Sequence, residues 1–410
     1  MSTVLVYTSP ARGHLYPLLP TLLELKARGH RVHVRTLSGE VAGLLRLGIE
    51  ASPILPSIEG TELDDWKAKS PLQAVGRTFT TWLERAAHEV ADLRAAIAAC
   101  APDVLYVDVN AWGALAAAEA SGLPFAVFSP YFLNVRAKGR PPFGLGLMPT
   151  TGVFGRIRDA VVRAVAGIAT RPYLRRLNAL RRGLGLPSLA SFEQLTSPAD
   201  RVIAYTAEPF EYGHGGWPDN VRFVGPGIWE PPAADELPGT RALVLVTCST
   251  EFQDDGALIA TALAALEAED VDVVATTAAL DPIQFRAPAN ATVLRYAAHG
   301  PLLRRAVAVI CHGGMGITQK ALAAGVPVCV VPFGRDQFDV GRHVEHAGAG
   351  VTLTRARLSA QALRDAVHRT RSLRAGAERV ARAFAASGGA ASAADVIDEL
   401  FTPRMRTSTA

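Results

Sequence analysis

The sequence predicts an α/β protein of two doubly wound domains, each a parallel sheet covered by helices on both faces. The chain of 410 residues is too long for one core and suits two domains of roughly 200 residues. Both halves alternate apolar, β-rich runs with segments of helical periodicity, which is typical of parallel sheets. Between the halves, residues 226–239 are dense in Pro and acidic side chains, which is a linker composition.

In the first half, short apolar or alternating runs predict strands, and longer runs of helical periodicity predict helices. The expected strands are 4–7, 31–36, 104–107 and 125–128. The expected helices are 15–28, which Gly29 ends, and 39–47, 72–99 and 111–121.

The second half repeats this pattern. Its expected strands are 242–247, 271–276, 307–311 and 328–331, and its expected helices are 256–268, 316–324 and 337–347, with more helix from about residue 359. We therefore divide the chain into an N-terminal domain (1–225), a linker (226–239), a C-terminal domain (240–385), and a C-terminal helix and tail (386–410). Residues 403–410 are expected to fray.

Composition excludes several classes of protein. Apolar residues make up 49% and charged residues 20%, which argues against a disordered chain, a collagen-like repeat and a disulfide miniprotein. The net charge of +4 is no footprint of nucleic-acid binding. Four cysteines without metal-finger spacing are expected to be reduced, three of them in strands. Neither a secretory signal nor a membrane-spanning run is visible, so we expect a cytoplasmic protein.

One segment is strongly basic. Residues 156–182 contain eight arginines against one acid, Asp159, interleaved with aliphatic side chains. Such a segment can lie on an anionic membrane or hold an acidic partner. The alternative is a solvated helical hairpin that caps a pocket. We favour the hairpin, because the small net charge adds little support for an anionic partner.

A strand that runs into glycines and then opens a helix is the strongest local motif. It reads Cys311-His-Gly-Gly-Met-Gly-Ile-Thr-Gln-Lys-Ala-Leu322. Glycines allow close approach of a ligand, and the N–H groups at a helix N-terminus favour phosphate, with His312 and Thr318 as further donors. A tight turn without a ligand is the alternative. The motif is neither GxxxxGK[ST] nor GxGxxG, which disfavours a nicotinamide-dependent oxidoreductase.

A second candidate site follows the first strand. His14 starts a helix at the carboxyl edge of the sheet, where an imidazole can act as a base near neutral pH. Asp108 follows strand 104–107 at the same edge and could accept a hydrogen bond from His14. The alternatives are a structural loop histidine and an aspartate that caps a helix.

Taken in order, these motifs resemble the GT-B-fold glycosyltransferases, the family of plant UDP-sugar and bacterial macrolide- and enediyne-type natural-product glycosyltransferases. The resemblance spans nearly the whole chain. It rests on Gly13-His14…Pro17, Thr250, Tyr296-Ala-Ala-His299…Leu302-Leu303, His312-Gly-Gly-Met-Gly316, Gly325-Val-Pro327 and Asp336-Gln337.

The resemblance implies two Rossmann-like domains that face each other across a cleft. His14 would deprotonate an acceptor hydroxyl and Asp108 would orient it. The C-terminal domain would bind the nucleotide sugar through its phosphates (Thr250, His312, Gly314, Gly316, Thr318), its pyrimidine (Tyr296, Ala297) and its sugar hydroxyls (Asp336, Gln337). Helix N–H groups would stabilise the diphosphate leaving group, so neither a metal nor a cofactor beyond this co-substrate is expected.

Three positions depart from the family pattern. Lys320 replaces a Glu that binds the ribose in many relatives, so it would contact ribose or phosphate instead. Ser249 replaces a Gly, and Val340 an Asn. Asp270-Val-Asp272 matches a DxD metal motif, but its acidic surroundings favour a solvated loop.

The acceptor would lie in the N-terminal domain near His14. Aromatic residues that could form an apolar lining are Phe79, Trp82, Trp112, Tyr131, Phe132 and Phe143, although each could equally be part of the core. Such a lining favours a flat or lipophilic acceptor.

These observations together predict an inverting, metal-independent glycosyltransferase. It would move a hexose or deoxyhexose from a UDP- or dTDP-sugar to a hydroxyl of a lipophilic small molecule, as a monomer or homodimer. One alternative is transfer to a membrane-linked acceptor. Another is a nucleotide-sugar-binding auxiliary protein without transferase activity.

Overall fold

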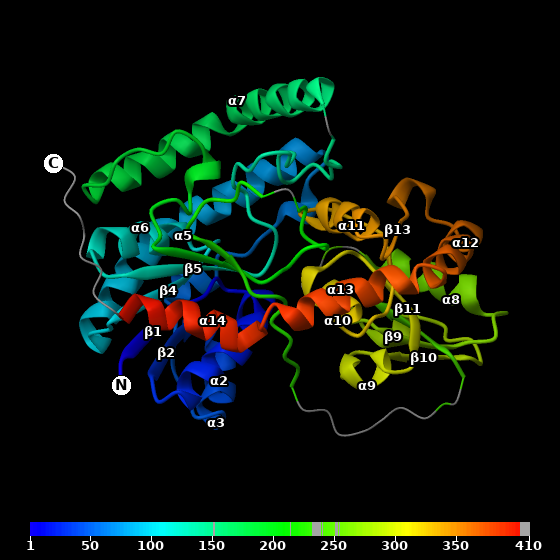
Figure 1. Cartoon of the computed structure of the whole chain (residues 1–410). Helices are drawn as coiled ribbons and strands as arrows, with labels where there is room; N and C mark the ends of the chain where they lie inside the picture. Colours follow the sequence, from blue (N-terminus) through cyan, green and yellow to red (C-terminus); the bar gives the residue numbers. More distant parts are fainter. Residues whose placement is uncertain are drawn as a thin grey trace.

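A computed structural model describes residues 1–150, 152–213, 215–231, 239, 241–250, 253 and 255–401. The chain forms two lobes, each with one parallel sheet (Figure 1). The N-terminal sheet contains β1 (Thr3–Tyr7), β2 (Arg31–Thr36), β3 (Glu50–Pro53), β4 (Val104–Asp108), β5 (Phe125–Ser129), β6 (Arg201–Ala204) and β7 (Val221–Phe223). Its helices are α1 (Arg12–Leu15), α2 (Leu19–Ala27), α3 (Ser38–Arg46), α4 (Pro56–Glu59), α5 (Pro71–Cys100), α6 (Trp112–Ser121) and α7 (Val153–Gly183).

The second sheet contains β8 (Leu243–Thr247), β9 (Asp272–Thr276), β10 (Ala291–Leu294), β11 (Ala306–Cys311), β12 (Val328–Val330) and β13 (Gly350–Thr352). Its lobe carries α8 (Gly256–Leu266), α9 (His299–Leu303), α10 (Met315–Ala323), α11 (Gln337–His346), α12 (Ala360–Arg371) and α13 (Arg374–Ala386), and α14 (Gly389–Asp398) follows.

The strand orders confirm the doubly wound fold. They are β3-β2-β1-β4-β5-β6-β7 and β10-β9-β8-β11-β12-β13, with all pairs parallel. In each sheet the order reverses at a central pair, β1 beside β4 and β8 beside β11. Open α/β sheets bind their ligands at such switch points, beyond the carboxyl ends of the strands.

Burial explains which strands the sequence revealed. The central strands β4, β5 and β8 are buried along their whole length, as parallel strands covered on both faces must be. The edge strand β3 has the sequence Glu-Ala-Ser-Pro and is partly exposed, so it contains no apolar run that would predict a strand. The short or partly exposed edge strands β7, β10 and β13 were missed for the same reason, whereas β6 was missed although it is an interior and largely buried strand.

The first expected helix, 15–28, is divided in the structure. Helix α1 ends at Leu15, Tyr16–Leu18 forms a 3-10 turn, and α2 begins at Leu19. Pro17 and Pro20 lack the N–H that a continuous helix would need at those positions. As a result, His14 lies on its own short helical turn beyond the carboxyl end of β1.

The basic segment is a single 31-residue helix, α7, so the expected hairpin is wrong. Pro172 lies inside the helix and removes one backbone donor without ending it. The helix lies along the top of the N-terminal lobe (Figure 1).

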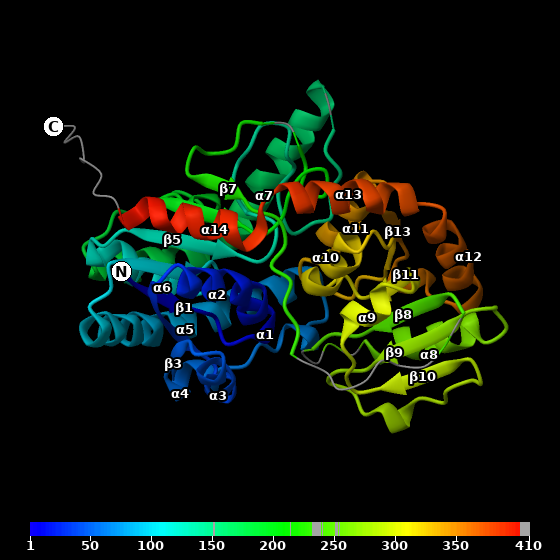
Figure 2. The same ribbon diagram turned by 60° about the horizontal axis from the view of Figure 1, so that its bottom comes forward.

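The C-terminal helices connect the two lobes. Figure 2 shows α13 and α14 in succession along one side of the molecule, α13 on the second lobe and α14 on the first. Arg28 at the end of α2 donates to Asp395 (2.7 Å) and Asp398 (2.8 Å) of α14. Of the expected linker, residues 232–238 lie outside the described residues, and so does the tail 403–410.

Three of the four free cysteines (Cys248, Cys311 and Cys329) are buried, as expected, and Cys100 is partly buried. Among the described residues, no helix is both long and apolar enough to cross a membrane.

Helices α5 and α6 approach too closely at Gly113 to admit a side chain. A Cβ there would lie 1.8 Å from the carbonyl oxygen of Ala86. We therefore expect Gly113→Ala to cost about 1–3 kcal/mol and to lower the melting temperature by roughly 2–10 °C in calorimetry. Gly167→Ala is the control, because a Cβ on that exposed helical position meets nothing within 4 Å. An unchanged melting temperature for Gly113→Ala would contradict this close approach.

Candidate active site

The carboxyl edges of the two sheets meet where α11 packs on the N-terminal lobe. Asp339 accepts a hydrogen bond from the Gly144 amide (2.9 Å), and the His343 ring stacks between Phe132 (3.5 Å) and Tyr212 (3.6 Å). Just before α11, Arg335 forms a two-pronged ion pair with Asp65 of the first lobe, both distances being 2.9 Å. These contacts hold the two switch points opposite each other.

His14 and Asp108 lie together at the first switch point. Nδ1 of His14 is 2.8 and 3.0 Å from the two carboxylate oxygens of Asp108. Asp108 is fully buried and also accepts from the backbone N–H groups of Ser9 (3.1 Å) and Asn110 (2.8 Å). The carboxylate is thus fixed by two backbone donors and can hold His14 in one orientation.

A hydrogen-bond chain continues on the other side of the imidazole. The amide nitrogen of Asn110 is 3.3 Å from Nε2 of His14, and the hydroxyl of Tyr131 donates to the amide oxygen of Asn110. With Asp108 accepting from Nδ1–H, Nε2 carries the lone pair and accepts from Asn110. An imidazole in this tautomer can take up a proton at Nε2. Asn110 was not predicted as a site residue, although it lies two residues beyond Asp108 at the same strand end.

A buried carboxyl group lies behind the dyad. Glu89 of α5 accepts from the Gly113 amide (2.8 Å) at the start of α6. Burial, assisted by the nearby Asp108 charge, raises the pKa of Glu89 to about 8. Glu89 is therefore largely protonated at neutral pH and adds little negative charge beside Asp108.

This pKa predicts a pH-dependent effect of Glu89→Gln. The native state binds a proton at Glu89 more tightly than the unfolded chain does, so wild-type stability falls as pH rises from about 4.5 to about 8. Gln keeps the acceptor oxygen without titrating. We expect the free energy of unfolding of Glu89→Gln, measured in urea, to rise relative to that of the wild type across this range, by on the order of a few kcal/mol at pH 9. The exposed Glu267→Gln is the control, and a difference that does not vary with pH would contradict the pKa of Glu89.

Three glycines at the second switch point shape the backbone between β11 and α10. Gly313 has φ +97°, and a Cβ there would lie 2.9 Å from Val330. A Cβ on Gly314 would lie 2.6 Å from Nε2 of His312, whereas one on Gly316 would meet nothing within 4 Å. The N-terminus of α10 is thus open at Gly316 and presents N–H groups to an anion.

His312 is nearly buried beside this helix end. Its Nδ1 is 4.0 Å from the carboxylate of Asp255, which itself accepts from the Ser249 amide (2.7 Å). Burial lowers the pKa of His312, and Arg335 lowers it further while Asp255 opposes the shift. The Thr247 backbone also opposes the shift, and the neutral ring carries one N–H group. Thr250 is exposed beyond β8, on the other strand of the same switch point.

Two of the expected donor-binding side chains point elsewhere. Thr318 is fully buried and its hydroxyl donates to the Gly314 carbonyl (2.9 Å), so it braces the first turn of α10 and does not face the cleft. Gln337 is 2% exposed; its amide oxygen accepts from Phe333 (2.7 Å) and Gly334 (3.1 Å), and its nitrogen donates to Gln253 (2.5 Å). Helix geometry, which a linear motif does not convey, turns both side chains inward.

Asp336 precedes α11, on the second lobe. Burial raises the pKa of Asp336, while its own backbone N–H, the Arg335 charge and the His14 charge act to lower it, so the carboxyl group interacts electrostatically with the His14 ring. The residue as a whole is only partly buried.

Lys320 is paired instead of lying free in the cleft. Its ammonium group donates to Glu230 (2.8 Å), whose other oxygen accepts from the Gly300 amide (2.9 Å). Burial alone would raise the pKa of Glu230, but Lys320 and the N–H donors hold it below its ordinary value. The expected contact of Lys320 with ribose or phosphate stays a prediction, and it would require Lys320 to leave or share this ion pair. Glu230, which lies in the expected linker, was not foreseen.

Near this pair, Tyr296 is 54% exposed, so its ring is accessible for stacking with a nucleotide base. Ala297 packs against the core of the second lobe. The DxD-like segment is only in part the solvated loop that the sequence predicted, because Asp272 begins β9. Asp270 is solvent-exposed, while Asp272 is paired with Arg241 (2.9 Å) and Arg305 (3.1 Å).

The six aromatic residues expected around the acceptor fall into three groups. Tyr131 packs edge-on against the His14 ring, with centroids 5.9 Å apart, and stacks on Phe143. Phe132 is fully buried between the lobes, so it cannot line an open site. Phe79, Trp82 and Trp112 form a separate cluster with Phe192 and Tyr173 beneath α7. Only Tyr131 and Phe143 therefore lie next to the dyad.

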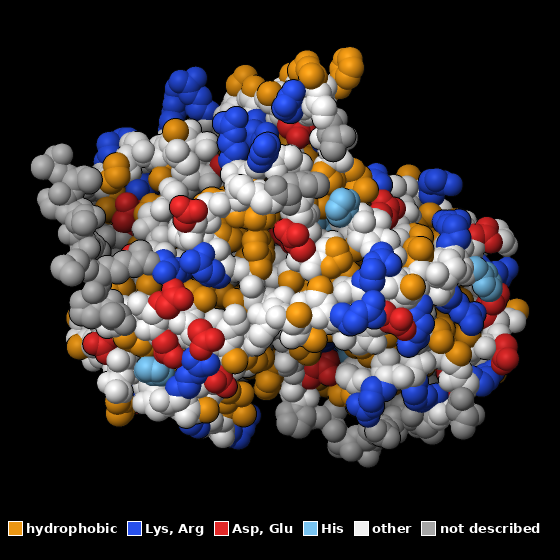
Figure 3. Space-filling view, in the orientation of Figure 1, with side chains coloured by type: hydrophobic (Ala, Val, Ile, Leu, Met, Phe, Trp, Pro, Cys, Tyr) orange, Lys and Arg blue, Asp and Glu red, His pale blue; other side chains and the backbone are white. Residues whose placement is uncertain are grey.

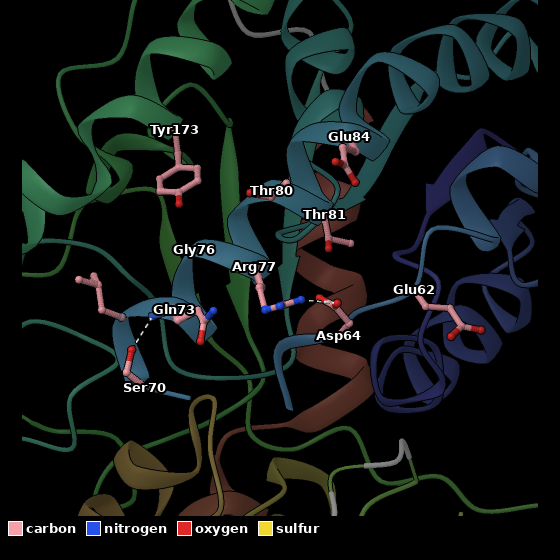
Figure 4. Close-up of a pocket in the computed structure, with 11 residues that line it drawn as sticks. Glu62, Asp64, Ser70, Gln73, Gly76, Arg77, Thr80, Thr81, Glu84 and Tyr173 are labelled. Atoms are coloured by element: carbon pink, nitrogen blue, oxygen red, sulfur yellow. Dashed lines mark hydrogen bonds and ion pairs between the residues drawn. The ribbon is translucent and has the colours of Figure 1, made fainter. Parts of the chain in front are cut away.

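A polar pocket of about 720 Å³ opens beside that cluster (Figure 4). Tyr173 of α7 points into it opposite the start of α5, and Arg77 forms an ion pair there with Asp64. Asp64 precedes Asp65, the partner of Arg335, so the pocket adjoins the contact between the lobes. The pocket is lined by Glu62, Asp64, Ser70, Leu72, Gln73, Gly76, Arg77, Thr80, Thr81, Glu84 and Tyr173.

Comparison with known proteins agrees with this geometry. Residues 260–400 match the family model described as the C-terminal domain of erythromycin biosynthesis protein CIII-like proteins. The chain is 33% identical to 4'-demethylrebeccamycin synthase of Lentzea aerocolonigenes, over 97% of this chain and 99% of that protein. The chain belongs to the natural-product glycosyltransferases.

Other glycosyltransferases are similar at lower coverage or identity. A PGL/p-HBAD biosynthesis glycosyltransferase of Mycobacterium tuberculosis is 32% identical over 69% of this chain and 67% of its own length. Among solved structures, the glycotransferase of kitacinnamycin superimposes with a TM-score of 0.78 at 23% identity, over 97% of this chain and 98% of that chain. The calicheamicin glycosyltransferase CalG4 superimposes with a TM-score of 0.75 at 22% sequence identity, over 98% of each chain. This glycosyltransferase therefore has the GT-B fold.

Proposed function

We propose that this glycosyltransferase moves a hexose or deoxyhexose from a UDP- or dTDP-sugar to a hydroxyl of a lipophilic small molecule, with inversion at the anomeric carbon. His14 takes the proton of the acceptor hydroxyl at Nε2. The acceptor oxygen then attacks the anomeric carbon, and the bond from that carbon to the nucleoside diphosphate breaks with its electron pair on the phosphate. A single displacement inverts the anomeric centre.

The observation that carries this proposal is the His14–Asp108 pair, with its 2.8 Å contact at the switch point of the first sheet. Buried Asp108 fixes the ring and stabilises the imidazolium that forms when the proton is taken. Asp336 of the other lobe, which interacts electrostatically with His14, would bind hydroxyl groups of the transferred sugar.

The open end of α10 suits the diphosphate. Gly314, Gly316 and neutral His312 offer N–H donors there, and the helix dipole stabilises the negative charge that leaves with the nucleotide. Tyr296 offers an exposed ring for the pyrimidine. Two structural neighbours were solved with thymidine diphosphate or dTDP, which favours these nucleotides among those to be tested.

A thermal-shift panel of UDP, dTDP, GDP, ADP and NAD, run with EDTA, tests the donor. A ligand at about 100 times its Kd stabilises the native state by about 2.7 kcal/mol, enough to move the melting temperature. We expect a shift with UDP or dTDP and none with NAD. The nucleotide found then selects donor sugars for an acceptor screen by mass spectrometry. No shift with either pyrimidine nucleotide would contradict the proposed donor.

A further inference from the structure

The first half of α7 exposes an apolar stripe. Besides Val153, the first residue of the helix, five of its large apolar side chains are more than half exposed, and Phe154 is 89% exposed. They are spaced three or four residues apart and therefore lie on one face. The stripe consists of Phe154, Ile157, Val161, Val165 and Ile168.

This face points directly away from the protein. The residues that α7 buries, among them Asp159, Leu177 and Arg181, fall on the opposite side of the helix by the same periodicity. Figure 3 shows apolar side chains gathered along the top edge of the molecule, over the right-hand end of α7. No element of the described chain covers the stripe.

The outward face becomes basic toward the end of the helix. Arg171, Arg175, Arg176 and Arg182 are exposed, and within the described part of the chain none of them forms an ion pair. Arg181, the remaining arginine of this half, serves the fold, because it pairs with Glu119 (2.7 Å). Asp159, the one acid of α7, is buried and paired with Arg158 (2.7 Å).

This distribution of charge selects the partner. A second copy of α7 packed on the stripe would bring arginines together with no exposed carboxylate of the helix to neutralise them. An anionic lipid surface can bind both the apolar first half and the basic second half of this face. The apolar side chains enter the boundary between headgroups and acyl chains, and the guanidinium groups bind lipid phosphates. We propose that the outward face of α7 docks the protein on an anionic membrane. The pocket beneath Tyr173 then lies close to the lipid.

Flotation of the full chain with vesicles tests the docking without any reference to transferase activity. The vesicles contain either phosphatidylcholine alone or phosphatidylcholine with 30% phosphatidylglycerol. We expect binding to the mixed vesicles to exceed binding to neutral ones about ten-fold or more at low salt, and to weaken in high salt. Absence of binding to mixed vesicles at low salt would overturn the proposal.

Two sets of exposed substitutions separate the contributions of the stripe and the charges. Phe154→Gln/Val161→Gln/Ile168→Gln removes apolar surface, and Arg171→Gln/Arg175→Gln/Arg176→Gln removes three charges. We expect each set to weaken binding to mixed vesicles about ten-fold or more with an unchanged melting temperature.

The control Arg357→Gln/Arg369→Gln/Arg371→Gln removes the same charge from exposed sites on the second lobe and is expected to bind like the wild type. Equal loss in the control would assign the binding to net charge and overturn the role of α7. A stripe-dependent dimer in light scattering, without vesicle binding, would assign the stripe to a second copy instead.

Discussion

Replacing His14 with Ala is expected to lower turnover about a hundred- to ten-thousand-fold while the affinity for the nucleotide stays unchanged. The imidazole is the basic group at the first switch point, held by Asp108 at 2.8 Å. It lies in the other lobe from the N-terminus of α10 with Gly314 and Gly316, the proposed diphosphate cradle. Turnover would be measured by product formation with an acceptor from the screen. Nucleotide affinity would be measured on the same protein by calorimetry.

Two further variants sharpen this test. Asp108→Asn keeps the shape of the side chain but removes the charge that stabilises the imidazolium, so we expect turnover to fall here as well. His368→Ala removes a half-exposed histidine of α12 and should behave like the wild type. Equal turnover of His14→Ala and wild type would exclude His14 as the base. Loss of both nucleotide binding and turnover would indicate a structural role for His14.

Placing an Asp at Gly316 is expected to weaken UDP or dTDP binding about ten- to hundred-fold. The new carboxylate would lie among the N–H groups that the cradle offers to the diphosphate, and would repel it. The fold should tolerate the change, because a Cβ at Gly316 meets nothing within 4 Å and an acid suits the first turn of a helix. Isothermal titration with the nucleotide measures the effect.

Gly316→Asn is the matched control, since it has nearly the same size as Asp without the charge. We expect Gly316→Asn to retain most of the affinity. If Asp and Asn weaken binding equally, steric exclusion and not charge is responsible. If neither weakens it, the diphosphate lies away from the N-terminus of α10, and the proposed cradle is wrong.

Local sequence sufficed for the fold class and for much of the site. Uninterrupted apolar runs, such as those that form β4 and β8, predict strands that are buried on both faces. Parallel strands place their carboxyl ends at one edge, which is why His14 and Asp108 could be paired before their distance was known. The same reasoning failed for edge strands such as β3, whose exposed residues carry no apolar period.

Side-chain direction could not be obtained from motifs. Thr318 follows the glycines closely, yet the helical turn directs its hydroxyl to the Gly314 carbonyl. Lys320 looked free to meet a ligand, but Glu230, 90 positions earlier in the chain, neutralises it. Phe132 looked like a pocket wall, but the packing of α11 buries it between the lobes.

The sequence by itself thus determined the two doubly wound domains, because hydrophobic periodicity acts locally, and it placed His14 and Asp108 just beyond or at the carboxyl ends of their strands. That β1 and β4 are neighbours, which brings these two side chains together, was decided by the tertiary structure. Only the tertiary structure decided which polar groups are already paired, which aromatic side chains reach His14, and which face of α7 is left uncovered. Those outcomes depend on contacts between residues far apart in the chain, and no local pattern records them.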